Sequence, residues 1–460
     1  MTMMRKAGIC RGCVVLAVWV LMSGIAGHAE PAPARMVSPS FAYLQTVLEA
    51  CDRALTNLPA FTATAERMAV RHLKGGVIGT CWGNQSLGPE LYGRSGNFVH
   101  IGHERPWKKD RTDAERAEDM TILGFDRALD AEDRGFLERD KKRGFLMIGL
   151  GPRDHPDIAP VVPEFEVFFD TGTGADDRQV LLSDGTRVGH LNHVINALHG
   201  WVLMAETVGA LTRHGKMPTM WKSYGWPDGK DWGNRYLGKQ QFHDDIQVPP
   251  CPAGELGRRY IEAIRSLVIQ FRDRELDSVR QAGVRMGDEI KAGRKIQVAW
   301  EGHMPEGYVA LRDDAAWCVS VQLHLFLESQ REGFRKGVPD GALVLRLGTY
   351  GLDPLGPPLF KEKNQPWILV AGDHNQPDWL GEKAGAPLYV PLRFPFGDAC
   401  VNLEGYPIPL FAPSGIMQAV AYEAILVEAI AHRDQSGMVE PQSGKPRVPI
   451  APPPPPQDAP

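Results

Sequence analysis

The chain has 460 residues, 43% of them hydrophobic, and a formal net charge of −5. This length exceeds what a single hydrophobic core usually serves, so we expect two or three domains. The charge balance is mildly acidic and no basic tract is present, which argues against nucleic acid as a partner.

The first 29 residues have the order of a secretory signal. Arg5, Lys6 and Arg11 are followed by an apolar run at 14–25, and small residues continue up to Ala29. This order predicts cleavage near Ala29 and a location in a bacterial periplasm. The run is short for a membrane span, so we expect no stable span after cleavage; an uncleaved anchor is the alternative.

Five of the seven cysteines remain beyond the signal, because Cys10 and Cys13 are removed with it. An odd, scattered set is not a disulfide framework, although a single disulfide is left open. Cys81 and Cys318 lie in apolar runs and are expected to be buried small residues. The five are Cys51, Cys81, Cys251, Cys318 and Cys400.

Residues 291–314 predict a helix end, a buried strand, a sharp polar loop and a second helix ending near Gly333. Gly293 ends the first helix, and the apolar run 295–300 suits a strand covered on both faces. Gly302 lets the backbone turn where this strand ends. Ligand sites in open α/β sheets form at such strand ends. The loop carries Glu301, His303 and Glu306.

An earlier stretch, 74–86, repeats this pattern, with Trp82 in the place of Trp300. Upstream of each stretch, at nearly the same distance, a helical run opens at a tyrosine, Tyr43 or Tyr260. A repeat separated by about half the chain indicates two copies of one domain.

Further strands are expected at 144–151, 166–172, 342–347, 367–371 and 388–392. Apolar helices are expected at 191–212 and from Ser414, as the cap, to about His432, and the helix expected at 260–290 has one apolar stripe. The charge-rich segment 104–142 is expected to be a helical excursion with a solvated surface and no chemistry. The aromatic segment 217–248 is expected to cross between the halves in an extended form.

Strands that alternate with helices predict parallel sheets covered on both faces. We therefore expect an α/β protein of two tandem, doubly wound, three-layer αβα domains. The expected order is a signal at 1–29, a Pro-rich spacer at 30–40, a first domain at 41–215, a crossing segment at 216–256, a second domain at 257–436 and a disordered Pro-rich tail at 437–460.

These elements resemble the sugar isomerase (SIS) domain family in its tandem form. Residues 260–307 look like the long first helix, first strand and ligand loop of such domains. Residues 397–431 are similar to the closing loop and helix of a poorly characterised branch, and 215–234 resemble the segment after the first closing helix. The resemblance covers roughly 41–436. It implies a small-molecule sugar or sugar derivative as ligand, because members isomerise phosphosugars, cleave a lactyl ether from one, or only bind them.

Family members hold phosphate in a Ser/Thr-rich loop after the second strand and with a Ser in the first loop, at helix N-termini. Here the loop after Leu347 offers only Thr349, and the loop matched to it in the first copy, 149–154, has no hydroxyl at all. The carboxylate of Glu301 would also repel phosphate. We therefore expect a carbohydrate that need not be phosphorylated.

Aldose–ketose isomerisation needs one group to move a proton between C1 and C2 and a second acid to open the ring. Glu301 and His303 are the candidates for these two roles, in either order. His374, after the strand 367–371, can converge on them and is the third catalytic candidate. Sugar sites often stack a ring on tryptophan and bracket it with amides. The substrate-binding candidates are Trp82, Asn84, Ser86, Glu306, Thr349 and Asp373.

Structural roles compete with these assignments. The Glu301 loop could be a solvated loop, and Trp82 and Trp300 end buried strands, as core residues do. Glu206 and Glu428 fall at similar points of the two closing helices, where a carboxylate must be paired, so we expect them at the interface between the copies. Two histidines three apart can share a metal, but no carboxylate or cysteine completes a recognised spacing around His190, His193 and His199.

No dinucleotide fingerprint, phosphate loop or nucleophilic serine motif is present, so we expect no metal and no cofactor. The leading hypothesis is an exported protein that binds or isomerises a carbohydrate by aldose–ketose chemistry. We expect the two domains to face each other, or the chain to form a homodimer, so that the strand-end loops enclose a cleft. The alternative is a non-catalytic sugar-binding or assembly module that has lost the phosphate loop.

Overall fold

The structure is a computed structural model that describes residues 37–80, 85–102, 111–302, 304–349, 355–373 and 388–435. All of these belong to one compact unit, 36–460. The predicted signal, most of the spacer and the predicted tail lie outside the described residues. The boundary between the two expected domains, at 216–256, stays a prediction.

Two parallel sheets organise the described chain. The first has the order β1-β2-β3-β4, formed by Ile78–Thr80, Met120–Gly124, Leu146–Gly151 and Val167–Asp170. The second has the order β11-β10-β9-β7-β8, formed by Leu388–Leu392, Trp367–Gly372, Val344–Leu347, Ile296–Trp300 and Cys318–Gln322. A small antiparallel hairpin, β5 (Arg178–Leu181) and β6 (Arg187–His190), follows the first sheet.

The two sheets share one strand order, in which β1, β2, β3 and β4 correspond to β7, β9, β10 and β11. Only β8 has no counterpart among the named strands. Ile101 occupies its place in the first sheet, because it forms an isolated parallel bridge to Ile78 in β1. This correspondence is what the expected repeat requires, and it matches each strand end of the first half to a strand end of the second.

Five helices form the apolar layer of the fold: α1 (Pro39–Thr56), α2 (Leu58–Leu73), α6 (Asn192–Arg213), α8 (Glu255–Lys291) and α11 (Ser414–Asp434). Helix α6 packs on the first sheet, α8 and α11 pack on the second, and these helices also pack on one another. One continuous core cluster therefore joins both sheets.

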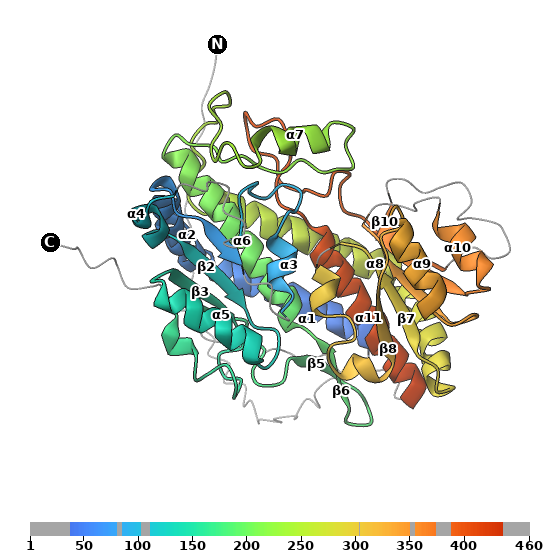
Figure 1. Cartoon of the computed structure of the whole chain (residues 1–460). Coiled ribbons are helices and arrows are strands. Elements are labelled where there is room, and N and C mark those ends of the chain that lie inside the picture. The colour runs from blue at the N-terminus through green and yellow to red at the C-terminus, as the bar shows by residue number, and fades with distance from the viewer. Residues whose placement is uncertain are drawn as a thin grey trace, which may run out of the picture. The chain divides into compact units, whose positions relative to one another are not determined.

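Alternate residues of each strand face different cores, as strand geometry requires. Ile122 faces the helical layer, whereas Leu123 faces a separate cluster beneath α5 (Ala131–Lys142). Val298 and Ala299 divide in the same way, the latter toward α9 (Glu328–Gly337) and α10 (Gly356–Glu362). Both sheets are thus covered on both faces, in the three-layer arrangement predicted from the sequence (Figure 1).

Two described helices, α6 and α11, are long and apolar enough to cross a membrane by length and composition alone. Their most apolar windows are 100% and 94% buried inside the protein. Helices that are apolar on all sides and buried in this way form protein cores.

The two tyrosines that open the repeat have matching contacts. Tyr43 donates its hydroxyl proton to the backbone oxygen of His190, just before α6, at 3.0 Å. Tyr260 donates to the backbone oxygen of Ala412, just before α11, at 2.9 Å. Each tyrosine therefore fixes its own half's first helix to the start of that half's closing helix.

The expected helical excursion at 104–142 is wrong. It contains α4 (Asp113–Ala117), the buried strand β2 and α5. A strand covered on both faces is a short apolar run, and here flanking charged residues conceal it. Because β2 is the second strand, the counterpart of the loop after β9 begins at Phe125. The match to 149–154 was therefore also wrong.

Three other expectations need correction. The polar loop is followed by 3-10 turns, Met304–Gly307 and Asp313–Ala316, and then by β8, instead of a helix. The crossing segment contains a helix, α7 (Gly229–Tyr236). Pro413 is the N-cap of α11, and Ser414 is its first residue. Among the described cysteines, Cys51, Cys251, Cys318 and Cys400 are all free.

Candidate functional site

A cavity of about 590 Å³ lies at the carboxyl end of the second sheet. Its lining includes one residue after each of three neighbouring strands: Glu301 after β7, His324 after β8 and Thr349 after β9. The strand order reverses between β7 and β9, because the chain continues from β7 to β8 on one side and from β9 to β10 on the other. Open parallel sheets bind ligands outside such a switch point.

Two other segments also line the cavity. One is 92–95, which follows the short helix α3 (Leu87–Leu91), and the other is 221–225. They add aromatic rings to a polar floor, and two rings at the cavity are open to solvent, Tyr224 at 64% exposure and Phe326 at 69%. A wall with apolar faces and a few polar groups is typical of small-molecule sites.

Glu301 is held in one direction by two strands. Its backbone N–H donates to Leu347, which places its side chain beside the end of β9. Arg346, which is 3% exposed, donates to one carboxylate oxygen, and the backbone N–H of Thr349 donates to the other at 3.3 Å. Arg346 also donates to the backbone oxygen of Leu323 at 2.7 Å. The carboxylate is therefore oriented, and a buried cation balances its charge.

His324 lines the cavity and was not among the candidates from the sequence. Burial lowers its pKa; Arg346 lowers it further and Glu301 raises it. The ring is therefore neutral at neutral pH and can accept a proton. His324 was not predicted from the sequence, because a helix ending near Gly333 was expected here and no strand end was foreseen.

Arg94 is a buried residue of the cavity wall, with 6% exposure. It donates to Asp398 at 3.1 Å and to Ser414 Oγ at 2.6 Å. Asp398 in turn accepts the backbone N–H of Ser414 at 3.1 Å, so it serves the N-terminus of α11. Lys222, the other cation of the wall, pairs with Asp228 at 2.6 Å.

The other candidates from the sequence lie elsewhere or outside the described residues. Ser86 is buried and donates to Asp126 from its backbone N–H at 2.7 Å and from its hydroxyl. Glu306 is exposed and is not among the residues around the cavity. Asp373 accepts from Arg393 at 3.1 Å. The candidates outside the described residues are Trp82, Asn84, His303 and His374.

The matching strand ends of the first sheet are filled by their own side chains. Asp126 binds both Ser86 and the amide of Asn196, the latter at 2.6 Å, and Gln85 donates to Asp133 at 2.8 Å. The space left beside them is about 10 Å³. That is room for about one water molecule. Among the described residues, the space at this point of the first sheet is thus far smaller than the cavity at the second sheet.

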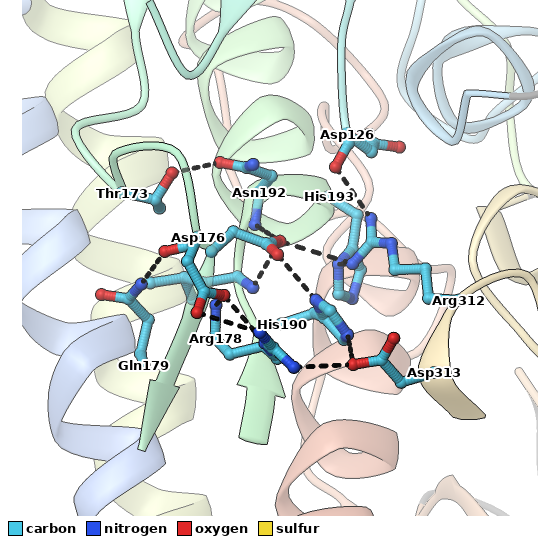
Figure 2. A network of polar contacts seen from close by, with 12 residues as sticks. Asp126, Thr173, Asp176, Arg178, Gln179, His190, Asn192, His193, Arg312 and Asp313 are labelled. Carbon is cyan, nitrogen blue, oxygen red and sulfur yellow. Dashed lines mark hydrogen bonds and ion pairs between the residues drawn. The ribbon is translucent and has the colours of Figure 1, made fainter. Parts of the chain in front are cut away.

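A second polar group joins the β5–β6 hairpin to the turn before β8 (Figure 2). Asp177 accepts from His190 at 2.6 Å and pairs with Arg312 at 3.5 Å, and Arg312 also contacts His193 at 3.1 Å. His193 Nε2 lies 3.6 Å from Glu423 on α11. Burial raises the pKa of Glu423 to about 8, against the charges of His190 and Arg312.

These contacts tie the two halves together, and we assign them a structural role. Although burial acts in the opposite direction, Arg312 and His190 hold the pKa of Asp177 below its ordinary value. Across the part of the chain that the structure describes, no group of three or more His, Cys, Asp or Glu side chains is placed to hold a metal ion.

The fold and the cavity define an α/β protein with two parallel sheets and a cavity at the switch point of the second sheet. No protein-family model matches the sequence, and neither does any curated protein. Several solved structures are similar to the chain over most of its length. A protein from Silicibacter pomeroyi DSS-3 assigned as a phosphosugar isomerase is 13% identical, with a TM-score of 0.41, over 88% of this chain and 100% of its own.

A protein from Salmonella typhimurium LT2 assigned as sugar-binding is 12% identical, with a TM-score of 0.45, over 84% of this chain and 98% of its own. A protein from Clostridium difficile 630 assigned as a phosphosugar isomerase is 8% identical, with a TM-score of 0.47, over 87% of this chain and 95% of its own. At these identities and TM-scores the likeness assigns neither a family nor an activity to this chain.

Proposed function

We propose that this protein binds a carbohydrate or sugar derivative in the cavity at the carboxyl end of the second sheet. The observation that carries the proposal is the convergence of Glu301, His324 and Thr349 on the switch point between β7 and β9. The resemblance of 260–307 to tandem sugar isomerase domains, and the strand order that the two sheets share, support it further.

The size and charge of the cavity favour a neutral polyol. A volume of about 590 Å³ lies within the range of small-molecule sites, roughly 300–1,000 Å³. Its two cations, Arg94 and Lys222, each pair with a carboxylate, and Glu301 adds a further carboxylate to the wall. Hydroxyl groups donate and accept, so they suit such a mixed wall better than a phosphate, which only accepts.

The reaction that this site supports is isomerisation of an open-chain sugar. A neutral His324 would take the proton from C2 of an aldose, and the C–H electron pair would form the double bond of an enediol. Return of the proton to C1, with net transfer of a proton from O2 to O1, gives the ketose with the same atoms. Glu301 would orient the hydroxyl groups at C1 and C2.

One observation favours the alternative, a non-catalytic sugar-binding module. Both oxygens of Glu301 already have partners, Arg346 and the Thr349 backbone. A carboxylate held in this way is suited to position a hydroxyl rather than to move a proton. Binding is therefore the part of the proposal that the geometry supports best, and turnover is the part to be tested second.

We also propose that the protein works outside the cytoplasm, because residues 1–29 have the order of a cleaved signal. A periplasmic location makes a phosphorylated metabolite a less suitable ligand. Fractionation of cells that produce the full chain, followed by N-terminal sequencing of the mature protein, tests this step. Recovery of uncleaved protein from the cytoplasm would contradict it.

The first experiment is a thermal-shift screen of the mature chain, residues 30–460, against free sugars, sugar acids and sugar phosphates. A ligand at a hundredfold its dissociation constant adds about 2.7 kcal/mol of stability. A free sugar should raise Tm, and Glu301→Gln should remove the shift. Glu306→Gln is the matched control, because this glutamate is exposed and is not part of the cavity wall.

Two outcomes would change the proposal. A shift with sugar phosphates alone would show that the inferred preference for a neutral polyol is wrong. No shift with any compound would remove the cavity as a carbohydrate site. If a free sugar binds, incubation followed by separation of aldose and ketose decides between an enzyme and a binding module.

A further inference from the structure

A buried glutamine stands behind the cavity wall with one oxygen unused. Gln418 lies on α11 and is 0% exposed. Its amide nitrogen makes a long contact to Thr349 Oγ1, at 3.5 Å. Its Oε1 has no hydrogen-bond partner among the described residues. Buried polar atoms are nearly always paired, so this unpartnered oxygen close to the cavity wall is a candidate contact for a ligand group.

The position of this oxygen relative to Gly302 shows where that partner would lie. A methyl group on Gly302 would be 3.6 Å from Thr349 Oγ1, 3.8 Å from Arg94 Nη1 and 3.8 Å from Gln418 Oε1. Three polar atoms from separate segments therefore surround one point at the cavity wall. Because Gly302 has no side chain, none stands between its Cα and these three atoms, and its φ of +102° disfavours any other residue.

Among the described residues of the first half, the counterparts of Gln418 and Thr349 are paired with each other. Asn196 and Gln418 are each the fifth residue of their helices, α6 and α11. Asp126 and Thr349 are each the second residue after their strands, β2 and β9. In the first half Asn196 donates to Asp126 at 2.6 Å, and Asp126 also holds Ser86. In the second half the amide is present, as Gln418, but Thr349 stands in the place of the carboxylate of Asp126.

The chemistry of the three atoms selects the ligand group. Arg94 only donates, Gln418 Oε1 only accepts, and Thr349 can do either. A hydroxyl group donates one hydrogen bond and accepts others, so it satisfies all three. A phosphate or carboxylate oxygen would face the Gln418 oxygen without a proton between them, and an ammonium group would face the Arg94 cation.

We propose that Gln418, together with Arg94 and Thr349, binds a single hydroxyl group of the ligand beside Gly302 and determines specificity for it. This inference rests on the proposed carbohydrate function and identifies one hydroxyl group as the part of the ligand that is recognised. A site built to bind a hydroxyl rejects an analogue that lacks it, because buried polar groups are then left unpaired. Loss of that hydroxyl should weaken binding by about tenfold or more.

The test uses the mature chain and isothermal titration calorimetry. The probes are D-glucose, D-galactose, D-fructose and N-acetyl-D-glucosamine, and then each monodeoxy analogue of the sugar that binds. One analogue should bind the wild-type protein at least about tenfold more weakly than its parent. Gln418→Met, which keeps the side-chain volume and removes the acceptor, should weaken the parent sugar by a similar factor and abolish the difference between parent and analogue.

The matched control is Gln365→Met. Gln365 is also a buried glutamine with an unpartnered Oε1 among the described residues, but it is not part of the cavity wall. This variant should bind as the wild-type protein does. Equal binding by Gln418→Met with an unchanged preference among the analogues would overturn this inference and leave the cavity proposal intact.

Two other outcomes also test the inference about Gln418. If none of the four sugars binds the wild-type protein, the inference falls, and the wider screen above then decides whether the proposed function falls with it. If Gln418→Met does not fold, the analogue series on the wild-type protein is sufficient, because equal affinity for every monodeoxy analogue would overturn the inference.

Discussion

Glu206 and Glu428 stand at the same position, the fifteenth residue, of α6 and α11, and each binds the N-terminus of the helix that opens the other half of the chain. Glu206 accepts the backbone N–H of Gly257 in α8 at 2.7 Å. Glu428 accepts the backbone N–H of Ser40 in α1 at 3.0 Å and also binds its hydroxyl. This reciprocal capping ties the halves together and gives both repeated glutamates a structural role.

Replacing either glutamate should therefore destabilise the whole fold. Unpaired N–H groups and the helix dipole favour a carboxylate at each helix start. We expect Glu206→Ala to lower the free energy of unfolding by about 1–3 kcal/mol, because Gly254 and Thr62 also donate to this carboxylate. Urea unfolding measures the change, with the exposed Glu404→Ala as control. An unchanged midpoint would show that the cap contributes nothing.

Arg346→Met should change both stability and the titration of His324. Removing one partner of a buried ion pair costs roughly 3–5 kcal/mol, and less is expected here because Glu301 is partly exposed. Because Arg346 lowers the pKa of His324 and Glu301 raises it, the variant should raise this pKa. NMR titration of the His324 ring measures the shift. A lower pKa in the variant would contradict the proposed arrangement.

Stability should fall as the pH falls below about 6.5. Burial lowers the pKa of His72 to about 4 and that of His199 to about 3. Between these values and the ordinary pKa the unfolded chain binds more protons than the folded one, so acid favours unfolding. Urea unfolding from pH 7 to pH 4 measures the slope. His199→Phe should reduce it, and an unchanged slope would exclude His199 as a contributor.

Glu423 should have the opposite effect, a loss of stability as the pH rises. Burial raises its pKa to about 8, so between the unfolded value near 4.5 and this folded value the native protein holds an extra proton. Its contribution is complete below pH 4.5 and disappears as the pH rises through 8. Glu423→Gln cannot titrate and should remove this decline between pH 4.5 and pH 8. Parallel profiles for the two proteins from pH 5 to pH 8 would argue against a protonated Glu423.

Phe326→Ala should weaken carbohydrate binding without a loss of stability. The ring is 69% exposed at the cavity, and exposed substitutions usually change stability by less than about 0.5 kcal/mol. A ring face covered by a sugar loses that apolar burial in the variant, so we expect roughly tenfold weaker binding. Calorimetry measures the affinity, with Leu355→Ala as control, because Leu355 is exposed but is not part of the cavity wall. Equal losses in both variants would argue against stacking on Phe326.

The local pattern was sufficient for most strands of the two sheets and for the long apolar helices. Buried parallel strands are short apolar runs that end at glycine or polar residues, and 295–300 shows this plainly. For the same reason Glu301 could be proposed as a site residue from a strand end, whereas Thr349 was proposed from the resemblance of its loop to a phosphate loop. The pattern failed for β2, which is equally buried but lies between charged helices, and for the edge strand β8, whose Val319 and Gln322 are exposed.

The order of the strands could not be derived from the sequence. The switch point between β7 and β9 depends on which side each crossover passes, and that choice depends on packing against α8 and α11 rather than on the strands themselves. His324 reaches the cavity only because β8 lies beside β7, and Arg94 reaches it from a segment about 200 residues away in the chain.

Gln418 shows most clearly the difference between what the sequence determines and what the tertiary structure decides. In the sequence it is one polar residue within an apolar helix, and nothing in its spacing distinguishes it from a paired core amide. Its unpaired oxygen is apparent only when Thr349 and Gly302 are placed beside it. Periodicity and composition follow from local backbone geometry and so determine the elements, whereas hydrogen-bond partners distant in the chain follow from packing and so are decided by the tertiary structure.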